Sequence, residues 1–96
     1  MNSKKSETLS CIQAALNALD QEIKKPDMDR ITEIETLSDF QKLLEKMHED
    51  VELERLASPG ERRSGMGRVI ADSWPSASVL GEFVIKAENA FLNLRL

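Results

Sequence analysis

The sequence predicts an all-α fold of three main helices, and two observations lead to that fold class. Apolar residues recur at spacings of three and four along three segments, as they do on the buried face of a helix. Clusters that contain proline or glycine separate these segments. At 96 residues the chain has the length of one domain, so we expect residues 1–96 to form a single helical bundle.

The first helix is predicted over residues 6–24. Ser3 or Ser6 is suited to cap its start, and Pro26 ends it, because the residue before a proline is pushed out of the helical region. The segment is shorter than the three or four heptads of a typical coiled coil, which favours a helical hairpin or bundle. Its apolar positions form one narrow seam: Leu9, Ile12, Leu16, Leu19 and Ile23.

A second helix is predicted over residues 39–56, after a short helical or 3₁₀ turn near 28–36. Within that turn the apolar residues keep a strict spacing of three, which drifts about 60° around a helix at each step and leaves no single face. Ser38 followed by Gln41 matches a capping box, in which two side chains satisfy free backbone groups at a helix start. The apolar face of this helix contains Phe40, Leu43, Leu44, Met47 and Val51.

The third helix is predicted over residues 77–95, after a flexible loop at about 58–76 that is rich in glycine and proline. Ser73, Ser76 and Ser78 are the candidate caps of this helix. The helix carries two apolar faces. The broad face contains Val79, Leu80, Phe83, Val84, Ala87, Ala90, Phe91 and Leu94, and a second stripe contains Ile85, Leu92 and Leu96.

The second apolar stripe predicts self-association. A helix that is apolar on two sides is central in its fold, and only two other substantial helices are available to cover it. A second subunit would supply the missing cover, so we expect a homodimer packed through residues 77–95. The alternative is a three-helix monomer in which the 58–76 loop shields Ile85 and Leu92.

Composition narrows the class of protein. No apolar run approaches the roughly 18 residues of a membrane span, so we expect no membrane association. Cys11 is the only cysteine, which leaves no intramolecular disulfide and favours the reducing cytoplasm. The net charge of −4 argues against general affinity for nucleic acid.

Catalytic chemistry has few candidate residues in this sequence. The chain has one histidine, one cysteine and no tyrosine. Glu45 and His48 have the Glu-x-x-His spacing of di-iron bundles, but both point away from the predicted apolar face, where metal ligands gather. We interpret His48 as a surface residue that pairs locally with Glu45 or Glu52, and Cys11 as a boundary residue. We therefore expect no enzyme activity and no catalytic, cofactor-binding or metal-binding residues.

His48 also suggests a weaker alternative. One exposed imidazole on a small, acidic helical protein resembles the histidine phosphotransfer domains, and that resemblance implies phosphoryl transfer through His48. Those domains usually place a lysine and a glycine shortly after the histidine on the same helix. Here three acidic residues follow within four positions, and their charge opposes a phosphoryl group.

The basic octet at residues 61–68 is the one local charge asymmetry. It holds three arginines and one glutamate, whereas residues 1–60 hold eight basic and thirteen acidic side chains. Arginines in such a segment clamp carboxylates or phosphates. We therefore predict a small non-catalytic interaction or regulatory protein with a protein partner, and nucleic acid is the alternative partner. The predicted contact residues are Arg62, Arg63, Arg68, Trp74, Ile85 and Leu92.

Overall fold

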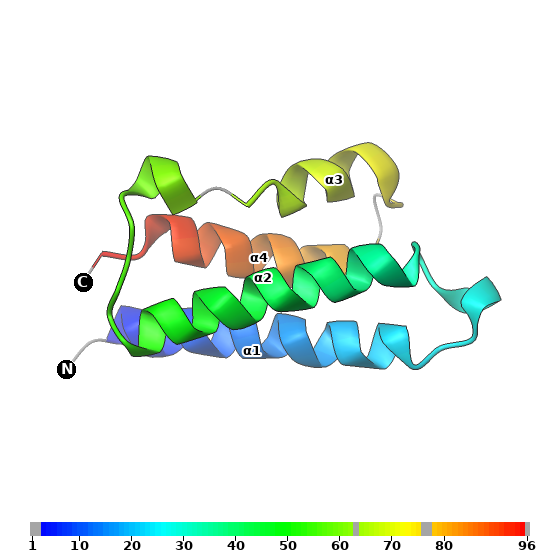
Figure 1. The fold of residues 1–96 in the computed structure, drawn as a ribbon, viewed down its shortest axis with the longest axis horizontal. Coiled ribbons are helices and arrows are strands. Elements are labelled where there is room, and N and C mark those ends of the chain that lie inside the picture. The colour runs from blue at the N-terminus through cyan, green and yellow to red at the C-terminus, as the bar shows by residue number, and fades with distance from the viewer. Residues whose placement is uncertain (1–2, 63, 76–77, 96) are drawn as a thin grey trace.

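The computed structural model describes residues 3–62, 64–75 and 78–95, and within these ranges it contains four α-helices, two short 3₁₀-helices and no strand. The predicted all-α helical bundle is confirmed for this part of the chain. In chain order the elements are α1 (Ser3–Ile23), η1 (Asp27–Asp29), α2 (Ile34–Glu52), η2 (Pro59–Arg62), α3 (Met66–Ser73) and α4 (Val79–Asn93) (Figure 1).

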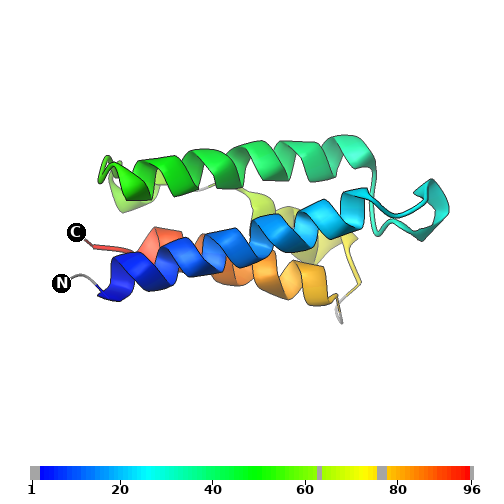
Figure 2. The ribbon, with the colours of Figure 1, turned by 90° about the horizontal axis from the view of Figure 1, so that it is seen from below.

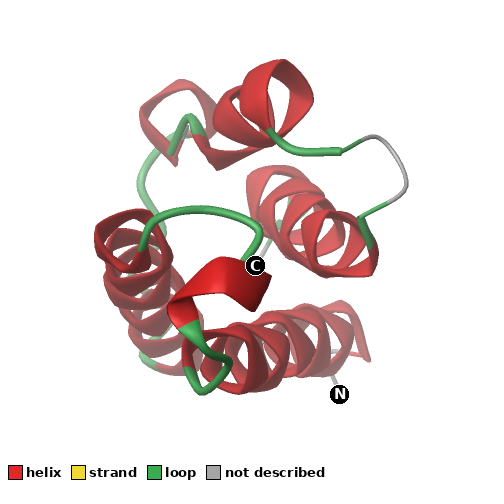
Figure 3. Ribbon diagram, turned by 90° about the vertical axis from the view of Figure 1, so that its right-hand side faces the viewer, coloured by secondary structure: helices red, strands yellow, loops and turns green. Residues whose placement is uncertain are grey.

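The helices form a bundle in which α1 packs against both α2 and α4, and α3 packs against α4. Both α2 and α4 run antiparallel to α1, so the beginning of α1 and the end of α4 lie at the same end of the molecule (Figures 1 and 2). Seen end-on, α3 covers the side of α4 that faces away from α1 (Figure 3). The bundle measures 43 × 22 × 21 Å.

One hydrophobic core runs through all four α-helices. Burying a leucine or isoleucine side chain stabilises a fold by about 1.5 to 3 kcal/mol relative to leaving it exposed. At one end of the core the rings of Phe40 and Trp74 lie 5.5 Å apart, and this contact joins α2 to the end of α3. The core contains Ile12, Ala15, Leu19, Leu37, Phe40, Leu44, Met47, Val51, Met66, Ile70, Trp74, Leu80, Val84, Ala87, Phe91 and Leu94.

The connection between α1 and α2 is held by polar side chains. The Nε of Arg30 donates a hydrogen bond to the carbonyl of Ile23 at 3.1 Å, and the buried carboxylate of Glu22 accepts one from the backbone N–H of Ile31 at 2.7 Å. Because α1 has no basic residue in its last turn, Arg30 supplies the cation that a helix C-terminus favours.

The start of the second helix differs from the prediction. Helix α2 begins at Ile34, and only η1 forms a separate turn in the predicted 28–36 region. Ser38 therefore lies inside the helix, and the capping box is wrong. The reason is Leu37, which has no exposed surface and continues the apolar face of α2 backwards by one turn.

The end of α2 also comes earlier than predicted. The helix ends at Glu52, and Glu54 then adopts a left-handed backbone with φ of 55°. Leu53 is exposed, whereas Leu56, beyond the turn, packs against the core.

The predicted loop at 58–76 contains η2 and α3, so the expectation of a loop without helical structure is wrong. Met66, Ile70 and Trp74 are spaced by four residues and are all buried, which places one face of α3 in the core. Gly65 precedes the helix as its N-cap with φ of 80°, a conformation that glycine adopts readily. The glycines that suggested a loop lie at the start of a short helix.

Helix α4 agrees with the prediction in position, and most of its predicted broad face is buried, namely Leu80, Val84, Ala87, Phe91 and Leu94. The Ser78 side chain accepts a hydrogen bond from the Gly81 N–H at 2.9 Å, which confirms one of the three candidate caps. Val79 and Phe83, expected in the core, are 65% and 40% exposed.

The second apolar stripe of α4 faces α3. Ile85 and Leu92 are half-buried, and both border grooves between these two helices. Leu96, the last member of the stripe, lies outside the described residues. Helix α3 and the turn before it therefore cover Ile85 and Leu92 in part and leave them accessible from the grooves.

Residues 37 and 38 test where α2 begins. Ser38→Ala is expected to change the free energy of unfolding by less than about 0.5 kcal/mol, because alanine is the better helix former and no cap is lost. Leu37→Ala is expected to lower it by about 2 to 5 kcal/mol through the cavity it leaves. Urea denaturation followed by circular dichroism measures both. A loss of about 1 kcal/mol or more in Ser38→Ala would instead indicate a capping role.

Candidate interaction surface

Two grooves lie along the line where α3 packs on α4, and together we call them the α3–α4 seam. Arg68 and Leu92 line the first groove, of about 360 Å³, together with Glu88. Trp74 and Ile85 line the second, of about 310 Å³. Four of the six residues that the sequence predicted as contact residues therefore meet on one surface. Helix α3 runs antiparallel to α4, so that its start lies beside the middle of α4 and η2 lies beside the end of α4 (Figure 1).

Arg62 is inside the protein, where it bonds the C-terminal end of α4. Its Nη1 donates hydrogen bonds to the carbonyls of Phe91 at 2.6 Å and Leu94 at 2.8 Å, and its Nε donates to the carbonyl of Ala57 at 2.9 Å. Carbonyls at a helix end have no donor within the helix, and α4 has no basic residue in its last turn. Arg62 donates hydrogen bonds to these carbonyls and also supplies a positive charge at this helix end. With 8% of its surface exposed, it presents little to a partner.

The other two predicted arginines have different positions. Arg63 lies outside the described residues. Arg68 is exposed in the first turn of α3, and it forms no ion pair within residues 3–62, 64–75 and 78–95. A cation in the first turn is opposed by the helix dipole, so Arg68 does not stabilise its own helix.

Glu88 is a structural position in the seam that the sequence reasoning missed. Its carboxylate is buried and accepts hydrogen bonds from the Ser64 hydroxyl and from the Gly67 N–H, the latter at 3.2 Å. Helix α3 has no acidic residue in its first turn and no side-chain cap, so Glu88 supplies the negative charge that its N-terminus favours. A single signal was available in the sequence. Glu88 interrupts the apolar stripe between Ile85 and Leu92.

Gly67 permits the close approach of α3 to Glu88. A Cβ atom at this position would lie 2.7 Å from Oε1 of Glu88, closer than real Cβ contacts. Glycine at position 67 therefore lets the buried carboxylate reach the backbone of α3.

Trp74 belongs to the core and also lines the second groove. Its side chain is 6% exposed, and its Nε1 is buried with no hydrogen-bond acceptor within the described part of the chain. An unpaired buried donor costs about 1 to 3 kcal/mol, which packing against Phe40 helps to offset.

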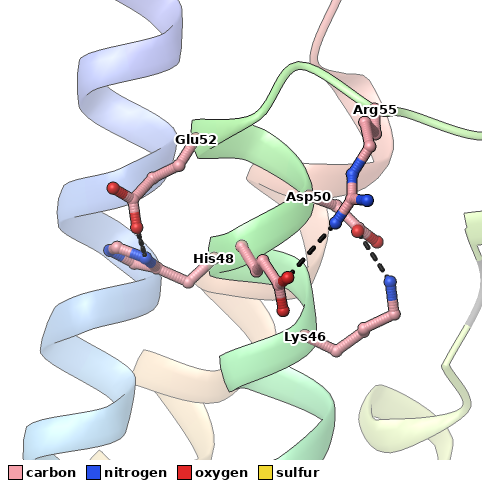
Figure 4. A network of polar contacts seen from close by, with 6 residues as sticks. Lys46, His48, Asp50, Glu52 and Arg55 are labelled. Carbon is pink, nitrogen blue, oxygen red and sulfur yellow. Dashed lines mark hydrogen bonds and ion pairs between the residues drawn. The ribbon is translucent and has the colours of Figure 1, made fainter.

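His48 and Cys11 lie away from the seam. His48 pairs with Glu52 on α2, with 2.7 Å between Nδ1 and Oε1, so the expected local pair is confirmed (Figure 4). The Lys46–Asp50 ion pair lies on another side of the same helix (Figure 4). Cys11 is half-buried in a groove between α1 and α4, as expected of a boundary residue.

Within residues 3–62, 64–75 and 78–95, no group of three histidine, cysteine or acidic side chains is arranged to hold a metal ion. In the same ranges, none of the helices has the length and apolar composition needed to cross a membrane. No protein-family model matches the chain, and no curated protein is significantly similar to it.

The two described arginines of the basic octet are expected to respond differently to replacement. Arg62→Met is expected to lower the free energy of unfolding by about 2 to 4 kcal/mol, because buried carbonyls at the end of α4 lose their charged donor. Arg68→Met, the matched control, is expected to change it by less than about 0.5 kcal/mol. Urea denaturation of the two variants measures the difference. Equal stability of both variants would contradict the structural role of Arg62.

Proposed function

We propose that the protein is a non-catalytic interaction protein that binds a protein partner along the α3–α4 seam. The observation that carries the proposal is the combination of features on this one surface. Two grooves lie end to end there, half-buried Ile85 and Leu92 border them, and the exposed cation of Arg68 has no ion-pair partner within the described residues. Apolar grooves with a few charged groups at their edges are typical of protein interfaces.

The arrangement of the two grooves, rather than the volume of either one, favours a protein segment over a small molecule, because each groove alone lies at the low end of the range for small-molecule sites. Small-molecule sites usually enclose about 300 to 1,000 Å³ in one cavity. Here the volume is divided into two grooves of about 310 and 360 Å³ along one pair of helices. Such a division suits two or more side chains presented in sequence by a partner segment.

Nucleic acid, the alternative partner, has less support. That proposal used the cations of Arg62, Arg63 and Arg68 together. The guanidinium of Arg62 is bonded to backbone carbonyls and buried, which removes its charge from the surface that would contact phosphates. Phosphoryl transfer through His48 is supported less still, because the imidazole is paired with Glu52.

Ala71 offers a direct test of the seam. It is exposed on α3 and lines the second groove, so Ala71→Lys is expected to fill the groove without disturbing the core. Affinity purification of the tagged protein from its native cell, with quantitative mass spectrometry, should then recover about tenfold less of its main partner. Ser73→Lys is the matched control, since Ser73 is exposed on the same helix and is not among the residues that line the groove. Equal recovery from the two variants would rule out the seam as the binding surface.

We also propose a homodimer that packs through α4, on the flank opposite α3. Its support is the exposed pair Val79 and Phe83, one helical turn apart, which are 65% and 40% exposed. Aromatic side chains are enriched at protein interfaces. This flank differs from the one predicted from the sequence, because α3 already covers much of Ile85 and Leu92.

Light scattering coupled to size-exclusion chromatography tests the dimer. At tens of micromolar we expect a mass of twice the 10.8 kDa chain, and Phe83→Glu is expected to shift it to the monomer by placing a charge in the interface. Asn89→Glu, which adds the same charge at another exposed position of α4, is expected to leave the dimer intact. A wild-type mass of 10.8 kDa would refute the dimer.

A further inference from the structure

The chemistry of the seam narrows the class of partner, an inference that rests on the proposed function. Ile85 and Leu92 are seven residues apart on α4, which is two helical turns or about 10 Å along the axis. Both are half-buried, and each borders one of the two grooves. The seam therefore offers two apolar contact points at a helical repeat distance.

The two ends of the seam carry opposite charges. Arg68 is exposed at the groove that Leu92 borders, and Glu82 is exposed at the groove that Ile85 borders. Neither side chain takes part in an ion pair within residues 3–62, 64–75 and 78–95. The remaining charged residue that lines the seam, Glu88, is buried and bonded to the start of α3. The net pattern is a cation at one end, an anion at the other and apolar side chains between them.

From this pattern we infer that the partner segment is an amphipathic α-helix with an acidic residue opposite Arg68 and a basic residue opposite Glu82. Its apolar residues recur about seven positions apart, to match Ile85 and Leu92. Strand addition, the mode in which an extended peptide pairs its backbone with a sheet edge, is not open to the described part of the chain, which contains no strand. A helix in a groove between two helices needs no backbone pairing.

Charge also sets the direction of the bound helix. The partial negative charge of a helix C-terminus is favoured near a cation, and the partial positive charge of its N-terminus near an anion. The partner helix therefore runs from Glu82 towards Arg68. In this direction it lies parallel to α4 and antiparallel to α3 (Figure 1).

Two synthetic helical peptides test the inference. Both are alanine-rich, about 18 residues long so that the helix forms in isolation, and carry leucines seven positions apart. The mixed peptide has lysine near its N-terminus and glutamate near its C-terminus, and the basic peptide has lysine at both ends. Because these end charges act differently on the dipole of each helix, the affinities are compared under conditions in which circular dichroism shows equal helicity. Neither contains tryptophan, so the fluorescence of Trp74, the only tryptophan of the chain, reports binding. Anisotropy of labelled peptide gives the affinity at low salt, where surface charge pairs are least screened.

The wild-type protein is expected to bind the mixed peptide about twofold to fivefold more tightly than the basic peptide, the range typical of exposed charge pairs. Arg68→Glu makes both ends of the seam acidic and is expected to reverse this order. Arg68→Gln, the neutral control, is expected to leave the two affinities about equal.

Three results would overturn the inference. If both peptides bind the wild type equally and Arg68→Glu does not change their order, charge does not select the partner, although the seam still binds helices. If neither peptide binds while Ala71→Lys still reduces partner recovery, the partner segment is not a helix of this kind. If the peptides instead dissociate a dimer in light scattering, the occupant of the seam is a second copy. The proposed function itself fails only if Ala71→Lys and Ser73→Lys recover equal amounts of partner.

Discussion

Buried hydrogen bonds to α4 hold the second half of this protein together. Arg62 bonds the carbonyls at the C-terminal end of that helix, and Glu88, within it, bonds the start of α3. Each charge lies where a helix end has an opposite partial charge, and each satisfies backbone groups that the helix leaves free. The two contacts fasten η2 and the start of α3 onto α4, in addition to the burial of one face of α3 in the core.

The C-terminal end of α1 is bonded by an arginine in the same way as that of α4. Neither α1 nor α4 has a basic residue in its last turn, and in each case an arginine from another segment bonds the last carbonyls. Arg30 does so for α1 and Arg62 for α4. These arginines tie the segments between helices to the bundle, which compensates for their low content of apolar residues. Arg68, in contrast, is exposed at the seam.

The proposed partner surface depends on this division of charges between interior and exterior. Had all the basic residues of the octet faced solvent, the segment would have resembled a phosphate-binding patch. With Arg62 inside and Glu88 buried against the start of α3, the seam presents one exposed cation and one exposed anion separated by apolar side chains. That pattern suits a helix of a protein partner, whose own dipole has two unlike ends.

The sequence by itself determined the all-α class, the helices at each end of the chain and most of the core, because apolar spacing is a local property that each helix carries in its own residues. Its surplus apolar stripe predicted Ile85 and Leu92 as contact residues, a role that remains a proposal. Tertiary structure alone decided that Leu37 extends α2, that α3 forms after Gly65, and that Arg62 is buried while Arg68 is exposed. The physical reason is distance along the chain. Arg62 bonds carbonyls 29 and 32 residues away, and α3 is stabilised by a carboxylate 21 residues beyond Gly67. No local pattern records contacts of that range, since they depend on how the helices pack.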